Sequence, residues 1–532
     1  MKPGMKTNYT IISIYHIAKA DFLERVRSYN FLIALGICIF MIYSFVPPLD
    51  AGYRIVTLGN YRGFYNSAWI GIMVAMCTPF FTLVNFYVVN YSVKRDIDTG
   101  VGQIIATTRI SRLQYLIGKL LSNFSVLLLI TALIAIMSIV MFYVRGESPQ
   151  IEIGKLLLPL FIFLVPAMFI IASLALFFDS IASLSRGSVN IIFFFLWIVL
   201  ISGSIWTYPI DVFGLNAGMN ELKHSISAVH QDWNGGFGVG INISGPQPDN
   251  KIFIWEGFIW SSPIILSRIY LMSAAFGLVL LVSSWFNRFD PSKITEKKQR
   301  SAWLSKKKQS IQNIYNSSSE IRYRDLPAVV AKFSFSSLIL AELRLILKGN
   351  STLWMVITFV TFTVSIFTPL DFAYKIILPL VWFFQILVLS NLGSREITQR
   401  CHEYIFPVAF HLRRQLSATI SAAVLLMLTV ALPVLVKVLI TGNLYAAYAI
   451  VVGALFIPAF AISSGILTGS SKLFEVLFTM MVYGILNNIP LFDFVGAIKG
   501  SRELGIAHYL LGITLLLIIL SFSVRRRQLT HL

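Results

Sequence analysis

Long apolar blocks separated by short polar segments dominate the pattern of this 532-residue chain. Each block has about 18–28 residues, the length that an α-helix needs to cross a hydrocarbon core some 30 Å thick. The pattern therefore predicts an all-α integral membrane protein with about twelve transmembrane helices. The predicted spans are residues 30–46, 67–92, 115–143, 155–178, 188–206, 264–286, 351–368, 372–393, 415–438, 444–467, 471–487 and 505–523.

One region of this pattern has a second interpretation. Pro458, Gly465 and Gly469 leave open that the pair of blocks after Asn443 breaks into re-entrant pieces. The bulk composition supports the membrane assignment in either case. Hydrophobic residues make up 56% of the chain and charged residues only 13%, whereas a soluble domain carries roughly 25% charged residues. Too little polar surface remains to cover a water-soluble globule of this size.

The formal net charge of +19 raises the question of nucleic-acid binding. The basic residues, however, lie in short clusters beside the apolar blocks and form no basic domain, so we expect no nucleic-acid partner. With the N-terminus in the cytoplasm, 32 of the 43 Lys and Arg residues fall on the cytoplasmic side. The positive-inside rule then predicts a multi-pass protein of the cell (cytoplasmic) membrane with both termini cytoplasmic and an even number of spans.

An internal repeat organises the chain. The matching residues are Asp21 with Glu342 and Pro48-Leu49-Asp50 with Pro369-Leu370-Asp371 at a shift of 321, and Arg95-Asp96-Ile97 with Arg395-Glu396-Ile397 at a shift of 300. Because each match falls at the same topological point, we predict two parallel six-helix repeats, residues 1–286 and 337–532. A polar, Lys-rich cytoplasmic linker, residues 287–336, joins them.

An amphipathic segment precedes each half. Phe22 and Val26 share one face of the first segment, and Leu343 and Ile346 share one face of the second, with charged residues on the other faces. Such a helix lies in the membrane interface with its apolar face at the acyl boundary. The alternative is that each segment is only the solvent-exposed end of the membrane span that follows it.

A long charged loop follows the second span of each half. The first loop, residues 94–119, has over twenty residues where a plain connection needs only a few, and this excess suggests a docking element. The alternative is an ordinary positive-inside loop. Its charged candidates are Arg95, Asp96, Asp98, Arg109 and Arg112, and those of the second loop are Arg395, Glu396, Glu403, Arg413 and Arg414.

At this point the chain resembles the membrane subunit of ABC-2 type transporters. That family has an amphipathic helix, six spans per subunit and a loop that runs from an acidic residue and Gly-Thr to Thr-Pro-Ile/Val-Ser-Arg and a final Gly-Lys. Val101 replaces the Thr of Gly-Thr here, and Arg109 replaces the Pro. The matching positions are Asp98, Gly100, Thr108, Ile110, Ser111, Arg112, Gly118 and Lys119, whereas the second half is more degenerate.

The resemblance implies the permease subunit of an ATP-driven exporter, with each half equivalent to one six-span subunit. It implies that the two loops dock two copies of a separate ATPase, which would hold ATP and Mg. The chain itself has no GxxxxGK[ST] phosphate loop, so we expect no ATP cofactor and no enzymatic activity in it. The exported cargo stays open among peptide, antibiotic and lipid-like molecules, and membrane lipid surrounds the chain.

The polar residues of the spans bear on coupling. The central portions offer uncharged groups such as Asn85, Asn90, Asn190, Gln385 and Asn391, which we interpret mostly as inter-helix hydrogen bonders. Ion-coupled carriers usually place charged residues there. In the outer loop, residues 207–263, the set His224, His230, Asp211, Glu221 and Asp232 lacks metal-binding spacing, so we expect no metal site. Trp206, Trp255 and Trp260 are predicted interfacial anchors.

Two other function classes stay open. The first is an ion-coupled twelve-span secondary transporter of the major-facilitator type, which shares six-plus-six parallel repeats and a basic central linker. Its usual Gly-x-x-x-Asp-Arg-type motif between spans two and three is absent here. The second is a membrane enzyme that handles lipid-linked substrates, which the lack of convergent catalytic acids or His pairs disfavours.

Overall fold

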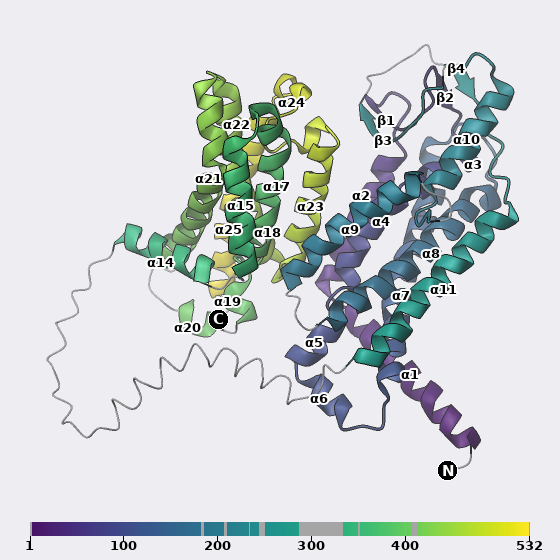
Figure 1. Cartoon of the computed structure of the whole chain (residues 1–532), viewed down its shortest axis with the longest axis horizontal. Helices are drawn as coiled ribbons and strands as arrows, with labels where there is room; N and C mark the ends of the chain where they lie inside the picture. The colour runs from purple at the N-terminus through teal and green to yellow at the C-terminus, as the bar shows by residue number, and fades with distance from the viewer. Residues whose placement is uncertain are drawn as a thin grey trace.

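The computed structural model of this protein describes residues 3–181, 186–206, 210–233, 235–243, 251–286, 334–348, 352–399, 401–406 and 412–530. Most of the predicted linker, residues 287–333, lies outside these ranges. Within them the chain is predominantly helical, and two helix bundles stand side by side (Figure 1).

The elements that precede the predicted linker form the first bundle, and those that follow it form the second. The first contains α1 (Pro3–Val26), α2 (Tyr29–Phe45), β1 (Tyr53–Thr57), β2 (Tyr61–Gly63), α3 (Ser67–Met76), α4 (Thr78–Val89), α5 (Ser92–Asp98), α6 (Val101–Ala106), α7 (Arg112–Arg145), α8 (Ile153–Ser180), α9 (Arg186–Trp206), α10 (Leu215–Val229), β3 (Gly238–Ile243), β4 (Lys251–Phe253) and α11 (Ser262–Trp285). The second contains α14 (Phe335–Lys348), α15 (Thr352–Phe367), α16 (Leu370–Phe372), the π-helical turn η1 (Ala373–Ile377), α17 (Leu378–Phe384), α18 (Ile386–Leu389), α19 (Arg395–Thr398), α20 (His402–Ile405), the π-helical turn η2 (Leu412–Leu416), α21 (Ser417–Ile440), α22 (Leu444–Thr468), α23 (Lys472–Leu486), the 3₁₀ turn η3 (Pro490–Phe492), α24 (Lys499–Glu503) and α25 (Ile506–Thr530).

Helices occupy every range that the apolar pattern marked as a span. Among the described residues, eight helices are long and apolar enough to cross a membrane, and two bent helix pairs raise the number to as many as ten. The remaining two ranges hold α15 and α23, which have 16 and 15 residues. The multi-pass membrane class is therefore supported, and the count of twelve spans stays a prediction.

Two sharp bends lie at predicted spans, one just before the first span and one within the second. The axis turns by 69° between α1 and α2, so α1 does not continue the direction of the first predicted span. It turns by 51° between α3 and α4 at Cys77. Pro79 sits in the first turn of α4, where its missing N–H leaves no helical hydrogen bond unmade, and this makes the bend inexpensive.

The region after Asn443 is continuous, so its re-entrant interpretation is wrong for α22. This helix runs unbroken for 25 residues through Pro458, since neighbouring helices bury that part of it. It ends at Gly469, whose φ of +63° is a left-handed cap that glycine adopts without a steric penalty.

Among the described residues, four short strands add to the helical class at one end of the first bundle, called the upper end here because it lies at the top of Figure 1. β1 pairs with β3 in antiparallel register, and β2 pairs with β4 in parallel register. The predicted outer loop is thus folded onto the segment between α2 and α3. Trp255, predicted as an interfacial anchor, is instead buried at 2% exposure and donates to Ser225 Oγ at 3.3 Å.

The opposite end, called the lower end, carries α1, α5 and α6 in the first bundle and α19 and α20 in the second (Figure 1). α23 of the second bundle contacts α2 and α4 of the first, and α18 contacts α9. Buried apolar side chains from both bundles form one continuous cluster. The two bundles therefore share a packed interface, and α23 is its main element from the second bundle.

Candidate functional site

A buried group of charges ties the amphipathic helix α1 to the loop after α4. Asp21 of α1 accepts hydrogen bonds from Arg95 of α5 at 2.6 Å and from Lys119 of α7 at 2.8 Å. Lys119 also pairs with Asp96 at 2.7 Å, and Arg25 pairs with Asp21 at 3.0 Å. Each carboxylate thus has at least one cation beside it, which buried charges require. The group links α1, α5 and α7 at the lower end.

The second bundle holds a related but smaller group. Arg395 of α19 donates to Glu342 of α14 at 2.9 Å, which is the counterpart of the Arg95–Asp21 pair at the matched sequence positions. Glu396 accepts from Arg525 of α25 at 3.2 Å, and Arg525 also donates to the carbonyl oxygen of Gly393 at 3.1 Å. The second acid is therefore neutralised from α25 and not from the helix that follows the loop.

The predicted docking residues fall into two groups by exposure. Asp96 and Glu396 are only 6% exposed, and Arg95 and Arg395 point inward to acids on α1 and α14. These four residues act within the protein. The exposed members are Asp98, Arg109, Arg112, Glu403 and Arg413, while Gly100 and Arg414 are half-buried.

The predicted interfacial residues face the protein. Phe22, Val26 and Leu343 are half-buried against the apolar core, and Ile346 is fully buried in it. The pairing of Asp21 and Glu342 with the loops turns this face of α1 and α14 inward. Toward the N-terminus the same face of α1 is exposed, with Ile11 and Tyr15 more than half exposed, and this part is the one available to lipid.

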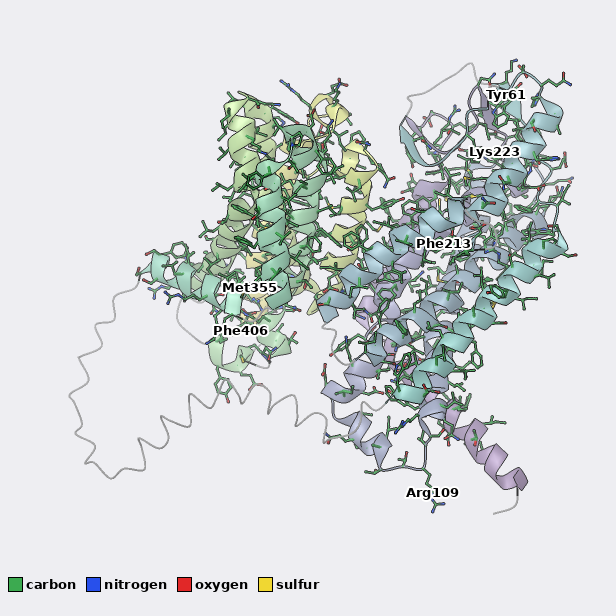
Figure 2. The ribbon with its side chains drawn as sticks, viewed as in Figure 1. Tyr61, Arg109, Phe213, Lys223, Met355 and Phe406 are labelled. Atoms are coloured by element: carbon green, nitrogen blue, oxygen red, sulfur yellow. The ribbon has the colours of Figure 1, made fainter. Side chains whose placement is uncertain are left out.

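The helix α6 projects from the lower end of the first bundle. Gly100 joins it to α5 with a φ of +77°, a conformation that favours glycine and gives this motif position a physical reason. Ser111 and Gln114 form a reciprocal capping box that starts α7. Between these two fixed ends Ile104 is 68% exposed, and Arg109 points away from the helices (Figure 2). The segment is an exposed platform of apolar and basic side chains.

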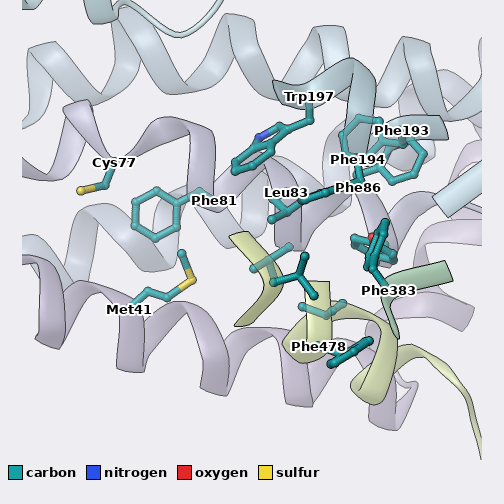
Figure 3. Packing of buried hydrophobic residues seen from close by; sticks show 14 of the residues in the cluster. Met41, Cys77, Phe81, Leu83, Phe86, Phe193, Phe194, Trp197, Phe383 and Phe478 are labelled. Carbon is teal, nitrogen blue, oxygen red and sulfur yellow. The ribbon is translucent and has the colours of Figure 1, made fainter. Parts of the chain in front are cut away.

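Aromatic side chains seal the interface between the bundles in its middle. Tyr483 of α23 contacts Trp197 of α9 with ring centres 4.8 Å apart and Phe80 of α4 at 5.6 Å. Phe194 of α9 contacts Phe383 of α17 at 4.7 Å. Figure 3 shows Trp197, Phe194 and Phe383 in this packing. These contacts fill the middle of the interface, on the upper side of the cavity described next.

Below the aromatic contacts the interface opens into a cavity of about 360 Å³, called the interbundle cavity. Its wall combines the lower ends of α2, α4 and α9 with the start of α23 and the turn before α19. Glu475 of α23 is 6% exposed and accepts from Asn190 of α9 at 2.6 Å. Asn190 in turn accepts from Asn90 at 3.2 Å. Side chains from both bundles therefore build the floor of the cavity.

The uncharged polar residues that the sequence places in the spans fall into two groups by their position. Asn90, Asn190 and Asn391 line the interbundle cavity, whereas Asn85 and Gln385 lie fully buried in helix packing. Sequence reasoning missed Glu475 and Lys472, which lie in the first turn of α23. A single acid in an otherwise apolar block was the available signal for Glu475.

The charges of the upper end hold the strands in place. Arg62 of β2 forms two hydrogen bonds with Glu147 at 2.8 and 2.9 Å. Partial burial alone would raise the pKa of Glu147, but the hydrogen bonds from Arg62 and the Tyr65 amide lower it below its usual range. Asp232 accepts from Lys251 and Tyr61, and these bonds lower the pKa of Asp232 to about 2.

The other acids and histidines named for the outer loop are also dispersed. Asp211 pairs with Arg268 of α11 at 3.6 Å, and His230 stacks on the Tyr61 ring with centres 4.4 Å apart. Within the described part of the chain, no three His, Cys, Asp or Glu side chains gather as metal ligands would.

Comparisons with family models, with characterised proteins and with solved structures return no match for this chain.

Proposed function

We propose that this chain is the membrane-spanning permease subunit of an ATP-driven ABC exporter of the ABC-2 type. Its two halves of six spans form the translocation pathway, and both termini lie in the cytoplasm. Two copies of a separate ATPase dock on its cytoplasmic loops, bind ATP and Mg²⁺, and supply the hydrolysis. The observation that carries the proposal is the exposed platform on α6, which is connected to the spans through buried ion pairs.

The connection explains how force would reach the spans. A push on α6 moves α5, whose Arg95 and Asp96 are held to α1 and α7 through Asp21 and Lys119. Because these charges are buried, separating them is costly, so α1, α5 and α7 move as one body. The aromatic contacts around Tyr483 lie between the bundles and would separate as the bundles rock.

The second bundle supports the same proposal. The Arg395–Glu342 pair connects α19 to α14 as Arg95–Asp21 connects α5 to α1. Glu403 on α20 and Arg413 are exposed at the same end. A second ATPase would dock there, although α19 and α20 have only 4 residues each.

One observation favours the alternative of an ion-coupled secondary transporter. Glu475 is a buried acid at the cavity between the bundles, and ion-coupled carriers use such acids to bind the coupling ion. Drive by a proton gradient without ATP, lost in Glu475→Gln, would support this class and contradict the exporter.

The test of the exporter is co-purification of the tagged full-length chain from mild detergent, with mass identification of its partners. We expect a stoichiometric ATPase that contains a phosphate loop, at about two copies per chain, as the family resemblance implies. Ile104→Glu on α6 should weaken this association at least tenfold. Val229→Glu is the matched control, because Val229 is 67% exposed on α10 at the upper end.

An unchanged partner yield in Ile104→Glu would contradict docking on α6. Purification of the wild-type chain without any ATPase would contradict the exporter itself.

A further inference from the structure

The wall of the interbundle cavity is rich in uncharged hydrogen-bonding groups. Ten of the residues that line it carry a hydroxyl or an amide side chain without charge. They come from both bundles and include Ser28, Asn90, Asn391 and Ser471. A cavity with this wall can exchange many hydrogen bonds with a ligand without a fixed charge on the ligand.

The charged side chains of the same wall are engaged by the protein. Arg25 pairs with Asp21, and Arg95 pairs with both Asp21 and Glu24. Glu475 accepts from the Asn190 amide, and Lys472 donates to the carbonyl oxygen of Val88 at 3.5 Å. A charged ligand head would have to compete with these pairs for its partner, whereas a neutral head would leave them intact.

One amide in the wall has an unused acceptor. Asn90 donates to Asn190, but its own side-chain oxygen is buried and has no hydrogen-bond partner among the described residues. A buried acceptor without a partner costs free energy. A ligand hydroxyl or N–H would remove that cost, so this atom favours a ligand that donates hydrogen bonds.

An apolar groove continues from the cavity. It runs between α2, α4 and α23, and its lining is apolar except for Lys472 and the Tyr87 hydroxyl. Tyr87, Val88 and Lys472 line both the cavity and the groove. The groove is shallow, and Ile33, Ala34 and Ile37 of α2 form one side of it. A single hydrocarbon chain could lie there with its head in the cavity and its outer side against lipid.

We infer that this interface binds an amphipathic substrate whose uncharged head, rich in hydroxyl or amide groups, occupies the interbundle cavity while its hydrocarbon chain lies in the groove. The inference rests on the proposed function, because it names the class of cargo for that pathway. The substrate approaches from the membrane past α2 and α23, since the groove lies between these helices and the aromatic contacts around Tyr483 fill the interface on the upper side of the cavity.

The test uses the full chain in lipid nanodiscs with Cys401→Ser, which removes the exposed cysteine, and Ser471→Cys, which places a thiol in the cavity wall. The rate of maleimide labelling at position 471 is measured with octyl glucoside below its micellar concentration. Octyl sulfate, octylammonium and glucose alone serve as comparisons. We expect octyl glucoside to slow labelling at least threefold and the other three probes to change it by less than about 1.5-fold.

Two variants test the two parts of the site. Asn90→Leu removes the unused acceptor, and Ala34→Trp fills the groove; each should abolish the protection by octyl glucoside. Matched controls are Asn220→Leu on exposed α10 and Ala274→Trp on the outer face of α11, which should keep it.

Equal protection by octyl sulfate or octylammonium would overturn the assignment of an uncharged head, and protection that survives Ala34→Trp would overturn the groove. The assay contains neither ATPase nor ATP, so its outcome is independent of the co-purification experiment. Selective protection in a chain that binds no ATPase would keep this site and reject the exporter. An ATPase partner without selective protection would reject only this inference.

Discussion

The charge groups at the lower ends of the two bundles share one pair and differ in the next. Asp21–Arg95 and Glu342–Arg395 join matched positions, and the acids are equally buried, with both side chains 4% exposed. Their arginines are also alike, at 26% and 27%. The same kind of ion pair therefore connects the amphipathic helix to the loop in both bundles.

The difference lies in the cation that neutralises the second acid. In the first bundle Lys119 of α7 serves Asp21 and Asp96 together. The matched position in the second bundle, at the shift of 300, is Thr419, and Arg525 of α25 pairs with Glu396 instead. Each buried acid is therefore still paired with a cation, but the cation comes from a different helix in each bundle. In the first bundle the ion pairs thus connect the loop to the helix that follows it, and in the second bundle they connect the loop to the last helix.

The largest effect is expected for Lys119→Met. This change removes a cation that is 3% exposed and leaves two buried acids with fewer partners, so the free energy of unfolding should fall by about 4–5 kcal/mol. The measurement is an unfolding titration with SDS in mixed micelles. Lys155→Met is the control, since the Lys155–Glu152 pair is 39% and 59% exposed and its loss should leave the free energy of unfolding almost unchanged. Similar losses for the two variants would break the comparison.

A smaller loss is expected for Arg525→Met. Glu396 loses its closest cation, but Arg395 stays 3.8 Å away, so the free energy of unfolding should fall by about 3 kcal/mol in the same titration. Glu396→Gln in the same chain should restore most of the loss, because it removes the charge left unpaired. A loss above that of Lys119→Met, or no recovery with Glu396→Gln, would show that α25 is held by packing and not by this pair.

These ion pairs also show which features of the structure could be predicted from the sequence. The apolar pattern located the helices, and the repeat matched Asp21 with Glu342 and Arg95 with Arg395. The sequence placed both arginines on a docking surface, whereas the structure pairs each of them with the matched acid of its own half. Such residues are readable because an acid or a base beside an apolar block has few reasons to be there. The inward direction of Asp96 was not readable, because a charge in a polar loop looks the same whether it faces solvent or a buried lysine.

The parts that escaped prediction depend on contacts between distant segments. β1 pairs with β3 across more than 180 residues, and no local pattern announces such a partner. Glu475 meets Asn190 only because the two bundles pack together. The bend at Cys77 needed a proline at the right turn and a neighbour to fill the angle. In each case tertiary packing decides a feature about which the local sequence is silent.

The smallest effect is expected in two double-mutant cycles, one for each of the two matched ion pairs. Asp21→Asn with Arg95→Met and Glu342→Gln with Arg395→Met should each give a coupling energy of about 1.5 kcal/mol, equal within about 0.5 kcal/mol. Asp21 has additional partners in Lys119 and Arg25, so its single variant costs more than that of Glu342, but the cycle subtracts this difference. The exposed Asp232–Lys251 pair is the reference and should show almost no coupling. Coupling in one bundle alone would mean that the matched residues have different roles in the two bundles. Only one loop would then transmit motion to its amphipathic helix.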